Sequence, residues 1–492
     1  MDDGRETFMR DTDAFTWRME GDPGLRSTIV SVAWLKSSPD WDVIVRRMEQ
    51  GTRAVPTFRM VVVEPPARLA SPRWVVSPEF DLSWHLRRMD APAPHTPATV
   101  VEFARTAAMT EFDPAYPLWE FTLVENLVGG RAALVMKVHH ALTDGVGGME
   151  LAPLLFDLEP DADPPVDDLP EPPGERISGP GLVAQSLIRQ AGRAAGAVGQ
   201  ALTGAVPWVV RAARNPLRAA GDVGAMAASI GRTVAPVRRT MSPLMTGRSL
   251  QRHLDLLSVP LPALKAAASA GGGTVNDAFL TGITGGLARY HQGHGAPVDE
   301  LRVTMPISLR TDDDPAGGNR ITLQRFVVPV GAGDTAARMR AVRACSRSAT
   351  AEPALPHSNA IAGALNVVPT GVLGEMLKHV DFLGSNVPAP AVPLYLGGAE
   401  VTGLFAWGPT IGASLNVTLL SYRGTCCIGV TFDTAAVPDP DVLMTCLQAG
   451  FDELLALGAR RPPRARRPLV SDQFPGVPAR RVSSRPGVPS RR

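Results

Sequence analysis

Cysteine is scarce in this chain of 492 residues, and its placement excludes a disulfide framework. The four cysteines are Cys345, Cys426, Cys427 and Cys446, and no C-x-x-C spacing occurs among them. Adjacent cysteines such as Cys426 and Cys427 rarely bond to each other, so neither a stapled secreted domain nor a zinc ribbon is expected. The charged N-terminus lacks the apolar segment of a secretory signal. These features predict a reducing, cytoplasmic environment.

Excess charge of one sign is also missing. The net charge is +1, so the protein lacks the strongly positive charge that attracts nucleic acid, and we expect no nucleic-acid partner. Lysine is rare, since four of the 49 basic residues are lysine and the rest are arginine. Arginine suits phosphate recognition. However, the excess of arginine over lysine runs through the whole chain, which favours biased codon usage as its cause.

Long apolar runs are the third absence. No apolar stretch has the length and composition of a transmembrane helix. Residues 194–210 come nearest, but they are rich in alanine and include three glycines, a glutamine, a threonine and a proline. They predict a surface or interfacial helix pair. Any contact with a membrane or a lipid droplet is therefore expected to be peripheral, on the inner face.

The chain is longer than an ordinary domain with a single hydrophobic core, so we expect two subdomains. The pattern divides the chain into an N-terminal subdomain at 1–158, a linker and connector at 159–249, a C-terminal subdomain at 250–459 and a basic tail at 460–492. The start of the linker, 159–180, has seven prolines and seven acidic residues among its 22 residues and cannot build a core. The tail has ten arginines and seven prolines and is predicted to be disordered.

Both subdomains alternate between helical and strand patterns. In the first, helices are predicted at 41–55 and 99–112, followed by strands at 119–127 and 131–140. In the second, the pattern predicts a helix from residue 274, a strand at 301–310 and a hairpin at 413–433 that turns near Arg423.

The connector at 181–239 is rich in alanine, glycine and arginine, and Asp222 is its only acidic residue. Val183 and Leu187 lie four residues apart, as on the apolar stripe of a helix. Two interpretations stay open. The segment is either a helix that covers the seam between the subdomains, or a basic and apolar surface that touches anionic lipid.

The stretch with the clearest chemistry is RAALVMKVHHALTDGVGG, residues 131–148, where two of the nine histidines are adjacent. Alternation on a strand puts His140 on the same face as Leu134, Met136 and Val138, and His139 on the opposite face. The two histidines are therefore expected to have different roles. His140 follows the apolar face inward, to the point where the strand ends.

Imidazole accepts and returns a proton near neutral pH, so His140 is a candidate general base. Asp144, four residues later, could hold its geometry, and the glycines that follow, beginning with Gly145, let backbone or substrate come close. The alternative is a satisfied core histidine beside a turn aspartate. Metal binding is a weaker rival, because zinc sites prefer other spacings and no histidine or cysteine cluster completes one. We expect no metal.

Other catalytic signatures are missing. No G-x-S-x-G elbow occurs, nor a phosphate-binding loop ending in GK[ST], nor a G-x-G-x-x-G dinucleotide turn. No bound cofactor is predicted. A base without a nucleophile beside it favours direct transfer, in which the base activates a hydroxyl of the substrate itself.

HHALTDG, residues 139–145, fits the HHxxxDG signature of the CoA-dependent acyltransferase superfamily, which includes chloramphenicol acetyltransferases and peptide-synthetase condensation domains. Further motifs follow in order: DAFTWRMEGDP at 13–23, PLWE at 117–120, TVNDAFL at 274–280, PISLR at 306–310, GSNVPAP at 384–390 and GPTIGASLNVTLLSYRG at 408–424. Over about residues 10–457 the chain resembles the bacterial wax ester synthase/diacylglycerol acyltransferase family. It departs from the family pattern at two places. The residues before PLWE, EFDPAY, differ from the usual ones, and Ala389 stands where the family usually has glycine.

The resemblance implies an α/β fold with two chloramphenicol-acetyltransferase-like subdomains and an active site at their interface. His140 would lie at the junction, with acyl-CoA, a co-substrate, arriving from one side and the acceptor alcohol from the other. The implied reaction transfers a long-chain fatty acyl group to diacylglycerol and forms triacylglycerol. Long-chain alcohols, which give wax esters, are the other acceptor class.

Within that reaction we expect His140 to act as the base, with no covalent acyl-enzyme, beside His139. Asp144 is expected to hold structure, paired with Arg310. Asn276 could position the substrate or an oxyanion, or form a hydrogen bond at a helix start, and Asp277 could cap that helix. Two rivals stay open, namely a condensation-type acyltransferase with a carrier-protein donor, and a lipid-binding or scaffold protein.

Overall fold

The computed structural model describes residues 8–66, 71–142, 152–161, 169–177, 181–186, 188–189, 216–308, 321–331, 333–366 and 368–459. Several predictions lie outside these residues. They concern Asp144, Gly145 and Arg310, the interfacial helix pair at 194–210, and the disordered tail at 460–492.

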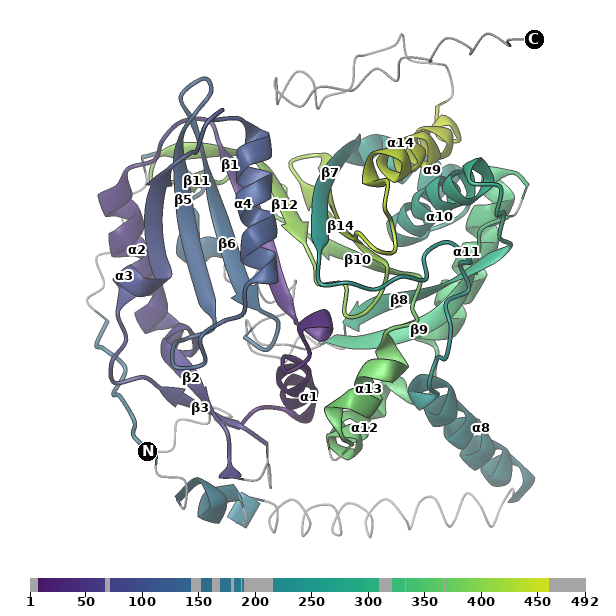
Figure 1. Ribbon diagram of the computed structural model, residues 1–492, viewed down its shortest axis with the longest axis horizontal. Helices are drawn as coiled ribbons and strands as arrows, with labels where there is room; N and C mark the ends of the chain where they lie inside the picture. Colours follow the sequence, from purple (N-terminus) through teal and green to yellow (C-terminus); the bar gives the residue numbers. More distant parts are fainter. Residues whose placement is uncertain are drawn as a thin grey trace, which may run out of the picture.

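Two mixed six-stranded sheets form the centre of the molecule (Figure 1). The first has the order β11-β12-β1-β6-β5-β4 and the second the order β7-β14-β13-β10-β8-β9. Their strands are β1 (Thr28–Leu35), β4 (Leu86–Asp90), β5 (Trp119–Leu127), β6 (Arg131–His139), β7 (Arg252–Pro260), β8 (Glu300–Ser308), β9 (Ile321–Pro329), β10 (Phe382–Pro388), β11 (Tyr395–Leu396), β12 (Ala399–Trp407), β13 (Leu415–Tyr422) and β14 (Thr425–Asp433). A small separate sheet pairs β2 (Met60–Val63) with β3 (Arg73–Val76).

Helices surround both sheets. The first half contributes α1 (Asp11–Met19), α2 (Trp41–Ala54), α3 (Leu82–His85), α4 (Pro97–Met109) and α6 (Ala152–Leu155). The second half contributes α8 (Pro216–Val234), α9 (Leu261–Ala270), α10 (Val275–Gly293), α11 (Thr335–Thr350), α12 (Ser358–Leu365), α13 (Thr370–Leu377) and α14 (Pro440–Ala456). Short 3-10 turns lie at Pro23–Leu25, Pro56–Arg59 and Leu355–His357. The α/β fold in two subdomains is confirmed.

The predicted strand patterns correspond to real strands. β5 and β6 pair in antiparallel fashion, and β6 is the strand on which the two histidines were expected. The hairpin of β13 and β14 turns at Arg423 and Gly424, with φ angles of 44° and 80°. Both angles are positive, as a two-residue hairpin turn that matches the right-handed strand twist requires.

One strand ties the two halves of the chain together. β12 comes from the C-terminal half, yet it pairs with β1 from Val30↔Trp407 to Ala33↔Leu404. The second half therefore supplies strands to both sheets. Burial of the edge of β1 by β12 removes an exposed sheet edge and fixes how the halves meet.

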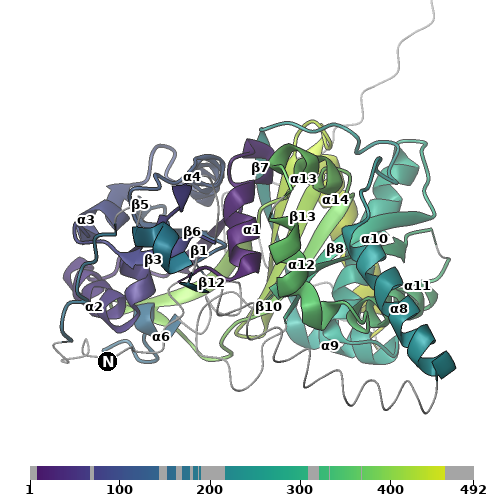
Figure 2. The same cartoon turned by 90° about the horizontal axis from the view of Figure 1, so that it is seen from below.

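α8 lies at the outer end of the second half, away from the first sheet (Figure 2). Its C-terminal turn is held by Ser229 and Arg232, which both contact Glu352. Within the connector, α8 therefore lies away from the seam between the sheets, whereas Gln185, in an earlier part of the connector, accepts from Arg73 of the first half at 2.8 Å. Among the described residues, no helix has both the length and the apolar character needed to cross a membrane.

Candidate active site

A large apolar cavity lies between the two sheets. It comprises about 1440 Å³ of empty space, part of which is open to solvent. The first sheet, α2 and α6 line one side, and β8, β9, β10 and β13 line the other. The lining residues are mostly apolar, with Met48, Phe58, Phe121, Met136, Leu155, Phe156, Leu383, Val387, Leu404 and Leu420 among the largest. Such a space suits a long apolar chain.

His140 lies at the edge of this cavity, where β6 ends. Its side chain is half-buried and lines the space together with Met136 and Val138, the residues predicted to share its face. Its backbone N–H donates to the carbonyl oxygen of Ser27 at 2.9 Å, which joins the end of β6 to the start of β1. The strand pairing thus fixes the position of His140 at the junction.

His139 lies on the opposite face and is completely buried. Its Nδ1 accepts the backbone N–H of Ala141 at 3.0 Å, so the ring proton must be on Nε2. That Nε2–H donates to Oε2 of Glu20 at 3.1 Å. The ring of Trp17 also meets His139 edge-on, with centroids 5.6 Å apart. Both ring nitrogens are engaged, so His139 is held in one tautomer.

Glu20 connects the two histidines. Its Oε2 also accepts the backbone N–H of Ser27 at 3.0 Å, and Ser27 in turn accepts from His140. Burial raises the pKa of Glu20, but the hydrogen bonds from His139 and from the Ser27 N–H, together with the charge of Arg26, outweigh it. The pKa of Glu20 is therefore lower than its ordinary value, and the carboxylate form is favoured. The sequence motif that contains Trp17 and Glu20 thus packs directly behind the histidine pair.

The same face of β6 carries a buried cation. Nζ of Lys137 lies 3.2 Å from Oε1 of Glu120 and 4.1 Å from the centre of the Phe112 ring. Burial lowers the pKa of Lys137, and Glu120 opposes that shift. Trp119 of the PLWE motif is buried, and its indole N–H donates to the carbonyl of Phe58 at 2.8 Å.

A few polar side chains interrupt the apolar lining, and sequence reasoning gave them no role. They are Ser31, Thr52, Ser385, Asn416 and Thr418. Asn416 donates from Nδ2 to the carbonyl of Pro409 at 2.7 Å and accepts from Thr418 Oγ1 at 3.0 Å. A Cβ on Gly408 would come within 2.6 Å of Asn416 Nδ2, so a side chain at position 408 would displace the Asn416 amide from this hydrogen bond. The signal in the sequence that could have identified Asn416 and Thr418 is that they are polar residues within the largely apolar strand β13.

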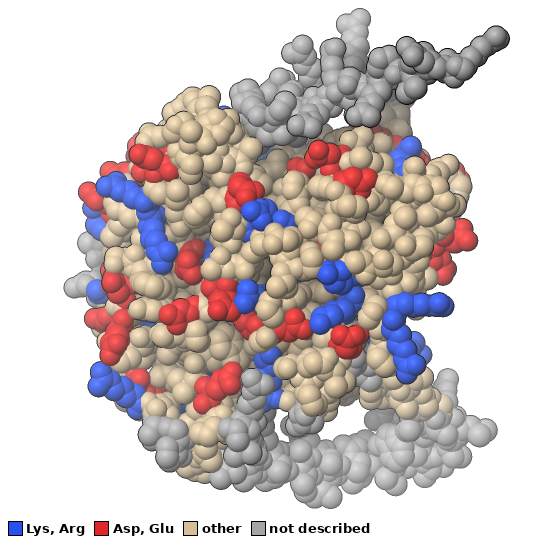
Figure 3. Space-filling model, viewed as in Figure 1, with Lys and Arg blue, Asp and Glu red and all other residues tan. Residues whose placement is uncertain are grey.

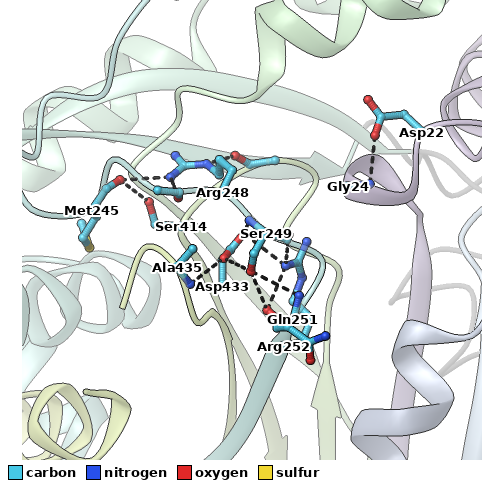
Figure 4. Close-up of polar contacts among 12 residues, drawn as sticks. Asp22, Gly24, Met245, Arg248, Ser249, Gln251, Arg252, Ser414, Asp433 and Ala435 are labelled. Atoms are coloured by element: carbon cyan, nitrogen blue, oxygen red, sulfur yellow. Dashed lines mark hydrogen bonds and ion pairs between the residues drawn. The ribbon is translucent and has the colours of Figure 1, made fainter. Parts of the chain in front are cut away.

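A second hollow lies on the other side of Gly408 and Pro409, which line both spaces. Its walls include Arg26 and Thr28 from the first half and Arg252 from the second. The wall is reinforced by a polar cluster around Asp433 (Figure 4). Asp433 accepts from Ser249 Oγ at 2.7 Å and from Arg252 at 3.1 Å. This second hollow therefore adjoins the cavity at Gly408 and Pro409.

Other predicted residues lie apart from the cavity. Asn276 donates from Nδ2 to the sulfur of Met305 at 3.2 Å and does not line the cavity. Asp277 completes a capping box with Thr274 at the start of α10, and it also accepts from Ser346 at 2.7 Å. Pro306 of the PISLR motif does line the cavity. A role for Asn276 in positioning substrate stays a prediction.

One group of side chains has the spacing needed for a metal. Among the described residues, ligand atoms of His253, Asp255 and Asp441 lie within 4.8 Å of one another. They lie on β7 and at the start of α14, and none of them lines the cavity.

Models of one protein family match both halves of the chain. The wax ester synthase/diacylglycerol acyltransferase catalytic domain matches residues 9–279, and the C-terminal domain of that family matches residues 317–455. A Mycobacterium tuberculosis protein, provisionally named a diacylglycerol O-acyltransferase, is 38% identical over 469 residues, which are 95% of each chain.

Solved structures show the same fold. The wax ester synthase/diacylglycerol acyltransferase of Marinobacter aquaeolei VT8 has a TM-score of 0.58 and 21% identity, covering 92% of this chain and 100% of that one. The first condensation domain of the calcium-dependent antibiotic synthetase has a TM-score of 0.58 and 14% identity, covering 93% and 97%. The chain therefore belongs to the wax ester synthase/diacylglycerol acyltransferase family, and it is an acyltransferase of that type.

Proposed function

We propose that this acyltransferase moves a long-chain fatty acyl group from acyl-CoA to diacylglycerol and forms triacylglycerol. The observation that carries the proposal is the setting of His140. Leaving hydroxyl groups aside, His140 is the only titratable side chain among the described residues that line the cavity. A single base at the edge of a large apolar space suits a reaction between two apolar substrates.

In the proposed reaction, His140 accepts the proton of the acceptor hydroxyl while the oxygen attacks the thioester carbonyl. The carbon–sulfur bond then breaks, and the protonated imidazole returns the proton to the departing CoA thiolate. No covalent acyl-enzyme forms. A positioned base of this kind contributes about 10²- to 10⁴-fold to the rate. The apolar walls would exclude water, which would otherwise compete with the acceptor alcohol.

The other predicted site residues support this base. His139 would anchor the end of β6 through Glu20 and thereby orient His140. Asp144, Gly145 and Arg310 keep the structural roles expected from the sequence, as part of the proposal. The cavity and the second hollow, which share Gly408 and Pro409 in their walls, would give donor and acceptor separate approaches.

Diacylglycerol is the acceptor that the name of the Mycobacterium tuberculosis relative supports. Long-chain alcohols are the alternative acceptors, because the family as a whole is named for both wax ester synthesis and diacylglycerol acylation. Such acceptors dissolve in lipid, so we propose that the enzyme works on the cytoplasmic side, in peripheral contact with a lipid surface.

The test compares wild-type protein, His140→Ala and His357→Ala, with labelled palmitoyl-CoA and either diacylglycerol or hexadecanol. His357 is exposed and lies outside the cavity, so it controls for the loss of an imidazole. We expect ester formation to fall by about 10²- to 10⁴-fold in His140→Ala alone, with an unchanged unfolding temperature. Equal rates for His140→Ala and wild type would overturn the role of His140. Product from hexadecanol only would overturn diacylglycerol as the acceptor.

A further inference from the structure

A groove rich in arginine lies on the second half of the molecule, outside the cavity. Its described lining contains Arg232, Arg238, Arg239, Arg302 and Arg325, and no acidic residue. The remaining lining residues are Ala235, Pro236, Val237, Phe326 and Val327. Figure 3 shows basic side chains gathered on this face beside α8. Five guanidinium groups around one hollow form a strongly positive surface.

Two of these arginines hold the backbone of the groove. Arg325 donates to the carbonyl of Ala235 at 2.5 Å, and Arg302 donates to the carbonyl of Arg239 at 3.0 Å. These bonds fix the segment 235–239 against β8 and β9. Burial lowers the pKa of Arg325, and the nearby charge of Arg302 lowers it further. Positive charges are thus crowded together at the base of the groove.

Two other arginines are available to a ligand. Arg238 and Arg239 are exposed, and neither side chain has a hydrogen-bond or ion-pair partner in the described part of the chain. Arg232 differs, because its guanidinium pairs with Glu352 at 2.9 Å. Neither guanidinium group is therefore held in an ion pair by the described residues, although Asp299 and Glu300 line a neighbouring hollow that Arg239 shares.

The groove is close to the cavity on the same face of the second sheet. Arg325 pairs with Thr304, and Thr304 pairs with Leu383, which lines the cavity. These residues form one row across β9, β8 and β10. Adjacent strands are about 4.8 Å apart, so Arg325 is roughly 10 Å from Leu383 along the row. One ligand could therefore place an anionic end in the groove and an apolar end in the cavity.

We propose that this arginine groove binds the phosphate groups of the acyl donor's coenzyme A. The inference rests on the proposed function, since it assigns a place to the polar end of the same donor. Guanidinium groups suit phosphates because they donate paired N–H bonds to two oxygens. The acyl chain would lie in the cavity, and the pantetheine arm would cross the row between the two.

The kinetic test uses the double variant Arg238→Gln with Arg239→Gln. We expect KM for palmitoyl-CoA to rise roughly 10-fold or more, since each lost bond to a charged group weakens binding, while kcat stays the same. KM for palmitoyl-pantetheine, which has no phosphate, should not change. The matched control is Arg340→Gln with Arg347→Gln on α11, two exposed arginines that lie outside the groove. An unchanged KM for palmitoyl-CoA in the groove variant would overturn the proposal.

A binding test separates this proposal from the catalytic one. Adenosine 3′,5′-bisphosphate is titrated calorimetrically into His140→Ala protein, with and without the groove substitutions. Binding that the groove substitutions abolish supports the proposal, even if no ester is ever detected. Equal binding by both proteins overturns it. Two further outcomes would overturn the proposal, both with bisphosphate binding unchanged by the groove substitutions. If these substitutions abolish binding to phosphatidylglycerol vesicles, the groove binds a lipid headgroup. If they abolish turnover with a palmitoyl carrier protein, the groove binds a carrier.

Discussion

His139 and His140 are adjacent in the sequence, yet the fold gives them opposite environments. Strand alternation directs His140 to the cavity and His139 into the packed interior. Both nitrogens of His139 are engaged, by the Ala141 N–H and by Glu20. A ring held in this way cannot exchange protons with a substrate. This supports the proposal that His140 is the base and that His139 positions it.

Glu20 gives the first prediction at the residue scale. Glu20→Ala would leave the buried Nε2–H of His139 without an acceptor, which costs about 1–3 kcal/mol of unfolding free energy. The end of β6 would also lose its anchor, so kcat should fall while the KM for acyl-CoA stays the same. Urea unfolding and steady-state kinetics measure the two effects. Full activity in a destabilised Glu20→Ala protein would contradict a positioning role.

The same carboxylate predicts a pH dependence of stability. The pKa of Glu20 is lower in the folded protein than the 4.5 expected in the unfolded chain. Its contribution is therefore fully present above pH 4.5 and is lost as the pH falls through the folded value. Glu20→Gln removes this contribution. The stability difference between wild type and Glu20→Gln should shrink from pH 6 to pH 3, which thermal unfolding across that range checks.

At the scale of elements, the crossing of α10 and α14 depends on glycine. A Cβ on Gly450 would lie 2.6 Å from the carbonyl oxygen of Gly282 and 2.9 Å from the carbonyl carbon of Gly285. These are backbone atoms, which cannot rotate away. The two helices can therefore approach closely only because both carry glycines at the contact, and this contact forms part of the core beneath the second sheet.

Gly450→Ala should accordingly destabilise the protein although alanine is the better helix former. Overpacking of this kind costs about 1–3 kcal/mol, which exceeds the gain of about 1 kcal/mol in helix propensity. Gly293→Ala, at the end of α10, is the matched control, because no atom lies within 4 Å of the added Cβ. Denaturant midpoints should fall for Gly450→Ala and stay level or rise for Gly293→Ala. A midpoint for Gly450→Ala that matches wild type would refute the argument.

At the scale of the whole molecule, local patterns predicted the elements but not how they meet. Strand alternation placed His140 correctly, and turn residues located the hairpin at Arg423, because both depend on neighbouring residues. The pairing of β12 with β1 joins residues more than 370 positions apart, from Val30 to Trp407. Nothing in either strand identifies its partner. Glu20 and Asn416 were missed for the same reason, since their roles depend on contacts made only in the folded chain.

The shared cavity gives the prediction that belongs to this scale. Ala406 lies on β12, opposite Ser31 of β1, and both residues line the cavity. Ala406→Phe would fill part of the space between the sheets and shorten the room for an acyl chain. Because each buried methylene contributes about 0.8 kcal/mol, the rate with palmitoyl-CoA should fall at least about 10-fold relative to hexanoyl-CoA.

Val392→Phe adds the same ring at an exposed position and should leave this ratio unchanged. Competition between the two donors in one reaction measures the ratio directly and cancels differences in the amount of active enzyme. If the rate of Ala406→Phe falls equally with both donors, and a short-chain acceptor restores that rate, the cavity holds the acceptor rather than the acyl chain. An unchanged ratio and rate in Ala406→Phe would show that neither chain enters the space beside β12. The outcome thus decides which substrate the seam between the two sheets holds, because β12 is where both halves of the chain contribute to one wall.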